Sequence, residues 1–257
     1  MVGEEDIARF YRSSYLPYHP LYANYDEKAE QRCVIVDQAV AGRRGDLLDL
    51  GCSYGFFLNA ARSHGWKVKG IEMGPLASRF ARDKYGLDVF EGTLDQANLA
   101  GSSLDVVTMF HVIEHAPKPL ELLSAVAKVL KKGGSLVLLT PNIESLHSQL
   151  LGKAWTWLHP PDHLFYFSRR SLGLALGQRG FRVNSLRSIT VDADNFLVQL
   201  SSLLIRTKEA SKSEVAYHSP GLFRLARLFT SQALLPERLL CSRIGREDEL
   251  FAIATKL

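Results

Sequence analysis

The residues best suited to bind a small ligand lie between positions 47 and 72. After an apolar run the chain reads Asp49-Leu50-Gly51-Cys52-Ser53-Tyr54-Gly55. Glycine at positions 51 and 55 allows a sharp turn and lets the backbone approach a ligand closely. Glu72 follows about 20 residues after the first of these glycines, the interval at which an acidic side chain binds a pair of ribose hydroxyls. The pattern therefore predicts a site for a nucleotide-type ligand.

Asp49 and the glycine spacing favour one class of nucleotide over another. A dinucleotide site needs a third glycine and a helix N-terminus that is free to bind a pyrophosphate. Here the spacing is Gly-x-x-x-Gly with Ser53 between the glycines, and Asp49 would place a carboxylate beside such a phosphate. A carboxylate at this position instead suits a ligand with a positive charge, such as an ammonium or a sulfonium.

Strand and helix signals alternate from residue 46 onward, and they place these residues. Apolar runs predict strands at 47–50, 67–72, 88–91, 105–110, 135–140, from 180 onward, and at 249–255. Periodic segments predict helices at 26–41, 56–64, 75–85, 119–130 and 169–179. Strands separated by helices at this interval imply a parallel sheet with helices on both faces. Ligands of such sheets bind where the parallel strands end.

Several motifs, in order and at consistent intervals, resemble those of the class I S-adenosylmethionine-dependent methyltransferases. Asp49 to Gly55 resembles motif I of that family, with Ser53 in place of the middle glycine. The segments Phe110-His111-Val112-Ile113-Glu114-His115 and Lys131-Lys132-Gly133-Gly134-Ser135 resemble the motif after strand four and the turn before strand five. A Pro-x-His-x-x-x-Phe segment, Pro161 to Phe167, is similar to that of the ubiquinone-biosynthesis-like and sugar-modifying branch. Its His163 and Tyr166 either meet an acceptor or, as we favour, only seat the next helix.

This resemblance covers roughly residues 45 to 185 and the final strand, and it implies an α/β fold. The expected core is a Rossmann-like seven-stranded sheet, mostly parallel with an antiparallel last strand, with helices on both faces. Helical additions are expected at the N-terminal and C-terminal sides. We expect a helical lid at 1–45, a cofactor-binding core at 46–191 with 246–257, and a helical cap at 192–245. For 196–240, an amphipathic surface for a lipid interface or a partner subunit is the alternative.

The resemblance also implies S-adenosylmethionine as the cofactor and assigns residues to it. Asp49, Gly51, Cys52, Ser53 and Gly55 would form its loop, and Glu72 with Met73 would hold the ribose. The adenine would lie at Gly92, Thr93 and Leu94, the methionine carboxylate at Arg32, and Phe110 with His111 would lie along the cofactor.

Methyl transfer needs alignment more than a strong base, but a hydroxyl acceptor must lose its proton. Positions 111, 114 and 115 share one face of a helical turn. We consider His111 or His115 as a general base, or a divalent metal at Glu114 and His115 as in some ubiquinone-pathway O-methyltransferases. In the favoured interpretation Glu114 and His115 bond to local backbone while His111 lines the cofactor pocket. His111 and His115 are the candidate catalytic residues, and no metal site is predicted.

Composition is that of an ordinary globular protein. The chain has 257 residues, 46% of them hydrophobic, and a net charge of +4, so nothing in the charge demands nucleic acid as a partner. Its three cysteines, Cys33, Cys52 and Cys241, have no disulfide or zinc spacing and indicate free thiols in a reducing compartment. We find neither a signal peptide nor a transmembrane run, and we expect a cytoplasmic protein.

The sequence therefore predicts a methyltransferase that moves a methyl group to a small-molecule acceptor, with a hydroxyl oxygen as the favoured acceptor atom. Two alternatives belong to other classes. An NAD(P)-dependent Rossmann oxidoreductase would use the same strand, loop and helix, although it lacks the third glycine. A non-catalytic module could keep the cofactor loop for binding or interaction alone.

Overall fold

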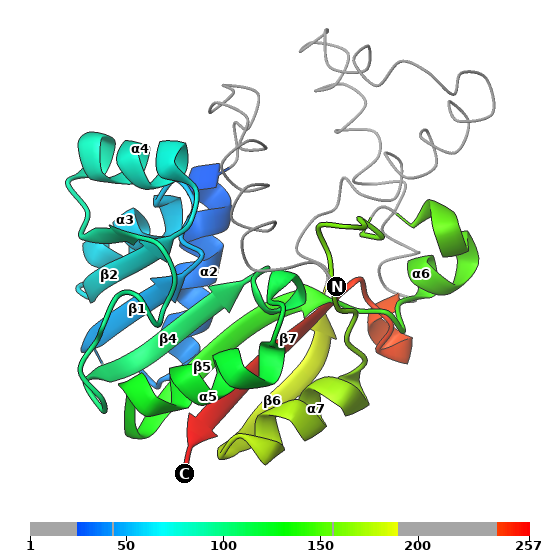
Figure 1. Ribbon diagram of the computed structural model, residues 1–257. Coiled ribbons are helices and arrows are strands. Elements are labelled where there is room, and N and C mark those ends of the chain that lie inside the picture. The colour runs from blue at the N-terminus through cyan, green and yellow to red at the C-terminus, as the bar shows by residue number, and fades with distance from the viewer. Residues whose placement is uncertain (1–24, 43, 156, 190–240) are drawn as a thin grey trace, which may run out of the picture.

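The computed structural model describes residues 25–42, 44–155, 157–189 and 241–257 (Figure 1). Residues 1–24 of the predicted lid and residues 192–240 of the predicted cap lie outside the described residues. The division into lid, core and cap thus stays a prediction. Among the described residues, we find no helix with the length and apolar character needed to cross a bilayer.

A single seven-stranded sheet organises the described part of the chain, in the order β3-β2-β1-β4-β5-β7-β6. The strands are β1 (Asp46–Leu50), β2 (Lys67–Glu72), β3 (Val89–Glu91), β4 (Leu104–Phe110), β5 (Leu130–Pro141), β6 (Phe181–Ile189) and β7 (Glu249–Lys256). The first five pair in parallel, whereas β7 runs antiparallel to both β5 and β6. The predicted fold class is confirmed.

The strand order reverses between β1 and β4, so the two loops that leave these strands diverge. Such a reversal point is where open parallel sheets bind ligands. The glycine loop follows β1 and His111 follows β4, which places both at this point. We call the end of the sheet at which β1 to β5 finish its carboxyl end.

Helices cover both faces of the sheet, as predicted. They are α2 (Tyr25–Ala39), α3 (Phe56–Ser63), α4 (Pro75–Tyr85), α5 (Pro119–Val129), α6 (Leu146–Leu151) and α7 (Arg169–Gln178). Apolar residues of α2, α3 and α4 share one core cluster with β1, and those of α5 and α7 share another with β4 and β5. Figure 1 shows α5 and α7 in front of the sheet and α2 and α3 behind it.

Some local structure differs from the sequence prediction. Strand β5 begins at Leu130 rather than at Ser135, because Leu130 pairs with Leu104 before Gly133 turns the chain at a φ of 77°. The preceding helix therefore ends at Val129. Helix α6 and two short 3-10 helices, η1 (Ile113–His115) and η2 (Gly152–Ala154), were not predicted, because segments of three to six residues show too little periodicity.

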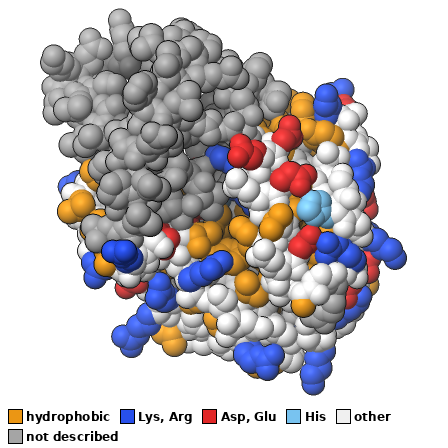
Figure 2. Space-filling view, turned by 180° about the vertical axis from the view of Figure 1, so that it is seen from behind, with side chains coloured by type: hydrophobic (Ala, Val, Ile, Leu, Met, Phe, Trp, Pro, Cys, Tyr) orange, Lys and Arg blue, Asp and Glu red, His pale blue; other side chains and the backbone are white. Residues whose placement is uncertain are grey.

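The surface carries charges of both signs. On the face seen in Figure 2, the Lys and Arg side chains drawn in colour are spread around the periphery, and Asp and Glu lie among them. This distribution gives no support to a nucleic-acid footprint on that face, where a basic patch would be expected.

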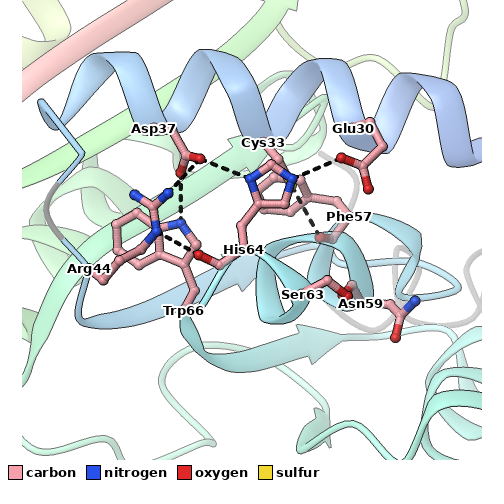
Figure 3. A network of polar contacts seen from close by, with 9 residues as sticks. All are labelled: Glu30, Cys33, Asp37, Arg44, Phe57, Asn59, Ser63, His64 and Trp66. Atoms are coloured by element: carbon pink, nitrogen blue, oxygen red, sulfur yellow. Dashed lines mark hydrogen bonds and ion pairs between the residues drawn. The ribbon is translucent and has the colours of Figure 1, made fainter.

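A polar network fastens α2 to the core (Figure 3). His64, after α3, places Nδ1 at 2.9 Å from Asp37 Oδ2 and Nε2 at 2.8 Å from Glu30 Oε2. Asp37 also accepts hydrogen bonds from Trp66 Nε1 and from Arg44, at 2.9 and 2.8 Å. Helix α2 is thus held by two of its own carboxylates, which lie on either side of Arg32 in the sequence.

We expect His64→Gln to loosen α2 in a pH-dependent way. Hydrogen bonds to Asp37 and Glu30 raise the pKa of His64 above its ordinary value. A raised folded-state pKa gives stability that is complete below about pH 6.5 and is lost as the pH rises through the folded value. Urea unfolding should show a loss of about 1 kcal/mol at pH 6, allowing for solvent screening, and a smaller loss at pH 9.

Arg62→Gln is the control. Arg62 lies on α3, two residues before His64, and it is exposed and bonds Asn59 of the same helix rather than α2. Equal losses at both pH values in His64→Gln would mean that the protonated histidine does not hold α2.

Candidate cofactor and acceptor site

The loop after β1 is built from left-handed backbone. Gly51, Ser53 and Gly55 have φ angles of 74°, 49° and 79°. The N–H groups of Gly51 and Cys52 both donate to the Ile71 carbonyl of β2, at 2.8 and 3.1 Å. The middle position of the motif therefore needs the conformation that glycine adopts most easily, and Ser53 adopts it with a side chain.

Both glycines of the loop lie against other elements. A Cβ on Gly51 would be 2.6 Å from Val112 Cγ2, and a Cβ on Gly55 would be 2.8 Å from the Ala81 Cβ. Contacts this short leave no room for a side chain. The loop is thus packed between α4 and the segment that follows β4.

Asp49 is buried beneath this loop, with 3% of its surface exposed. Its Oδ1 accepts a hydrogen bond of 2.6 Å from the hydroxyl of Thr108, its neighbour on β4. Burial raises the pKa of Asp49 to about 7, against the opposing effects of Thr108 and Arg32. A cationic ligand nearby would favour the ionised carboxylate, which agrees with the positively charged ligand predicted from the sequence.

Glu72 joins two loops at the carboxyl end of the sheet. Its Oε2 accepts from Ser53 N at 2.8 Å, and its Oε1 accepts from Gly74 N at 2.6 Å. Each carboxylate oxygen can accept a second hydrogen bond, so these contacts leave capacity for a pair of ribose hydroxyls. Met73 follows it and is half-buried.

The predicted adenine loop begins beside Glu72. Gly92 N donates to the Glu72 carbonyl at 3.0 Å. Thr93 N donates to Gln96 Oε1, and Leu94 is buried. The structure therefore brings the predicted ribose and adenine residues next to one another.

Arg32 of α2 reaches the opposite side of the loop. Its guanidinium carbon lies 4.8 Å from the centre of the Phe110 ring, which packs edge-on against Phe57. The Arg32 Nε is buried and makes no hydrogen bond to any described residue. Buried donors normally have acceptors, so an anionic group such as the cofactor's methionine carboxylate fits here.

His111 follows Phe110 and lies between two buried carboxylates. Its Nε2 is 2.9 Å from Glu249 Oε1 and its Nδ1 is 3.3 Å from Glu114 Oε1. Its ring stacks on Trp157 with centroids 4.9 Å apart and planes 11° apart. Burial by itself would lower the pKa of His111, but the two carboxylates outweigh it and raise the pKa to about 9.

His115 contacts the segment 157–167, which also supplies the Trp157 ring to His111. Its Nδ1 lies 2.9 Å from the Asp162 carbonyl oxygen, and its ring packs edge-on against His163. Asp162 outweighs burial and raises the pKa of His115. His115 thus bonds to backbone, but to that of Asp162, 47 positions away, and not to the local backbone that the favoured interpretation expected. The Glu114 side chain likewise bonds the Thr140 side chain and not local backbone.

Glu114, His115 and His163 each offer one ligand atom within 4.8 Å of the others. Each already has a protein partner, however. The Glu114 Oε2 accepts from the Thr140 hydroxyl at 2.9 Å, and His163 Nδ1 is 2.7 Å from the Trp157 carbonyl oxygen. These hydrogen bonds hold the three side chains in place through Glu114 Oε2 and the Nδ1 atoms of the two histidines. That no metal binds here stays a prediction.

The segment that contains His163 and Tyr166 is anchored to η1. Leu164 N and Phe165 N both donate to the Glu114 carbonyl, and the Tyr166 hydroxyl accepts from His159 N. Ser168 then caps α7 in a reciprocal pair with Ser171. These contacts favour the interpretation in which the segment seats the helix.

Glu249 and Trp157 were not identified as site residues from the sequence. Glu249 begins β7, and that strand runs antiparallel to the others, so its first residue lies at the carboxyl end of the sheet. The sequence did contain a signal for Glu249, because three successive acids, residues 247–249, stand at the start of a predicted strand.

Comparison with known proteins identifies the family. Residues 25–186, more than half of the chain, match the sequence profile described as Methyltransferase domain (Methyltransf_23). The chain belongs to this methyltransferase family. The match confirms the resemblance to class I S-adenosylmethionine-dependent methyltransferases and S-adenosylmethionine as the cofactor. The assignment of that cofactor to the glycine loop stays a prediction.

Curated relatives match over part of their length. The ubiquinone biosynthesis O-methyltransferase of Saccharophagus degradans is 31% identical over 160 residues, which make up 55% of this chain and 63% of that protein. The protein of the same name from Pseudomonas aeruginosa is 34% identical over 140 residues, 51% of this chain and 56% of that protein. The chain thus spans less than two thirds of these relatives.

Solved structures share the fold. A SAM dependent methyltransferase from Archaeoglobus fulgidus superposes with a TM-score of 0.59 at 21% identity, covering 90% of this chain and 94% of that one. Haemonchus contortus phosphoethanolamine N-methyltransferase 2, solved in complex with S-adenosyl-L-methionine, gives a TM-score of 0.63 at 15% identity, with 97% and 60% covered. At these identities the likeness concerns the fold alone.

We expect Gly51→Ala to destabilise the methyltransferase domain more than Gly86→Ala does. Both glycines have positive φ, but a Cβ on Gly86 would meet nothing within 4 Å, whereas one on Gly51 would meet Val112. The backbone cost of about 1 to 2 kcal/mol is common to both, and the stiff Val112 side chain adds about 1 to 3 kcal/mol for Gly51. Urea unfolding measures the difference, and equal losses would show that Val112 gives way.

Proposed function

We propose that this chain transfers the methyl group of S-adenosylmethionine to a hydroxyl oxygen of a small-molecule acceptor. The observation that carries the oxygen assignment is the position of His111 at the carboxyl end of β4, next to Phe110 and with a carboxylate facing each ring nitrogen. Family membership supports the methyl transfer, and the names of the relatives, O-methyltransferases at 31% and 34% identity, support oxygen as the acceptor atom.

The side chains around the glycine loop suit the charges of the cofactor. Arg32 would bind its carboxylate, Asp49 would favour its positive charge, and Glu72 would accept from its ribose hydroxyls. Methyl transfer is an in-line displacement, so the main task of these residues is to align the sulfur, the methyl group and the acceptor and to exclude water.

His111 is our first candidate for the group that takes the acceptor proton. Two carboxylates make it a stronger base than an ordinary histidine, with a pKa of about 9. A base of this pKa has a favourable driving force for taking the proton of a phenol, whose pKa is about 10, but it must first be deprotonated, so its action should increase as the pH rises toward 9. His115 is the second candidate. It follows His111 by four residues, but its Nδ1 is already bonded to the Asp162 carbonyl oxygen.

Two other functions are less well supported. An NAD(P)-dependent oxidoreductase would have to accept a phosphate beside the buried Asp49. A non-catalytic binding module would have no use for the basicity of His111. The proposal includes the lid at 1–45, the cap at 192–245 and, as the alternative for 196–240, contact with a membrane surface. It also includes a cytoplasmic location, with which three buried cysteines outside any disulfide agree.

Glu72→Gln tests the cofactor assignment. We expect it to weaken S-adenosylhomocysteine binding by about 2 kcal/mol, near 30-fold in Kd, because it removes the charge that strengthens the ribose hydrogen bonds. Isothermal titration measures this, with Glu91→Gln at the exposed end of β3 as the control. Unchanged affinity in Glu72→Gln would remove it from the ribose site, and heat from NAD alone would favour the oxidoreductase.

His111→Gln tests the proton acceptor, once a labelled-methyl screen of catechols, polyprenyl phenols, sugar nucleotides and lipid extracts has supplied a substrate. We expect kcat to fall about 100-fold or more, as for loss of a general base, while S-adenosylhomocysteine still binds. The base must be deprotonated, so the parent kcat should rise with pH up to about 9. His115→Gln and the exposed His159→Gln should change kcat less, and an unchanged kcat in His111→Gln would exclude it as the base.

A further inference from the structure

The contact between Glu249 and His111 joins residues that lie 138 positions apart in the sequence. Glu249 is the first residue of β7 and pairs with Pro141 of β5 and Ile189 of β6. Because β7 is antiparallel to β5, its first residue lies where β5 ends. Strand β7 is the only strand of the described sheet that is antiparallel to the others. Its first residue therefore lies at the carboxyl end of the sheet, close to His111 after β4.

Both acids that contact His111 are buried. Glu249 is 1% exposed and Glu114 is 0% exposed. A buried carboxylate is stable only with a charge partner or good hydrogen bonds. Among the described residues, His111 is the cationic group at ion-pair distance from both.

The ring of His111 is contacted at both nitrogens and on one face. Glu249 faces Nε2, Glu114 faces Nδ1, and the indole of Trp157 covers one face. Glu114 comes from η1, only three residues away, and is itself fixed by the Thr140 hydroxyl. Glu249 is therefore the group that ties this ring to the sheet from a distant part of the sequence.

We propose that Glu249 is a positioning residue for His111, and that its carboxylate fixes the imidazole at the carboxyl end of β4 through a direct charge contact. The catalytic meaning of this inference rests on the proposed function, because His111 matters for turnover only if methyl transfer uses it. The contact itself belongs to the resting protein and can be tested there.

The first test is an NMR titration of the histidine rings in the full chain, without cofactor or acceptor. The His111 signal is assigned by its absence from His111→Gln. In the parent we expect it to titrate near 9, because the charges of Glu114 and Glu249 outweigh burial. In Glu249→Gln we expect its acid dissociation constant to rise at least 10-fold, and Glu249→Asp should give an intermediate value.

Asp248→Asn is the matched control. Asp248 is the neighbouring buried acid and pairs with another histidine, His147, at 2.6 Å. Its loss should leave the His111 titration unchanged. A His111 titration that is the same in Glu249→Gln and in the parent would overturn the proposal. So would a parent value near 6.5, and that measurement needs no variant to fold.

The second test separates this inference from the proposed function. With an acceptor in hand, Glu249→Gln should shift the pH profile of kcat to lower pH and leave the affinity for S-adenosylhomocysteine unchanged. If the NMR shift occurs but no acceptor is methylated, the proposed function fails and the positioning role remains. If His111→Gln abolishes methyl transfer but Glu249→Gln moves neither the titration nor the profile, the positioning role fails and the proposed function remains.

Discussion

The structure depends on how buried carboxylates are paired at the carboxyl end of the sheet. Among the described residues five acids are buried, namely Asp49, Glu72, Glu114, Asp248 and Glu249. Every one lies near the end where β1 to β5 finish. A buried charge without a partner costs several kcal/mol, so each of these acids constrains the elements that supply its partner.

These partners connect parts of the chain that are far apart in sequence. Thr108 of β4 bonds Asp49 of β1, and the N–H of Ser53 links the loop after β1 to Glu72 at the end of β2. Thr140 of β5 bonds Glu114. Hydrogen bonds from neighbouring strands and loops therefore hold the site residues in place, so the sheet determines where the loops lie.

The fold could be predicted because its signals are local. Apolar runs and helical periodicity placed the seven strands and the core helices, and the glycines at 51 and 55 marked the ligand loop. The positive φ of Ser53 explains how a serine occupies the position of the missing glycine. What local signals did not give was the environment of His111, which is set by Trp157 and Glu249, 46 and 138 positions away.

Strand direction explains why the missing residue had to be Glu249. In a sheet of parallel strands, only residues at or just beyond each strand's last position reach the ligand. An antiparallel strand reverses this rule and delivers its first residue there, so Glu249 reaches His111 where β7 begins. The family resemblance implied an antiparallel last strand, and the acids that open this strand were visible in the sequence. Taken together, these two facts place a carboxylate opposite the residues that follow β4, which is where the structure has it.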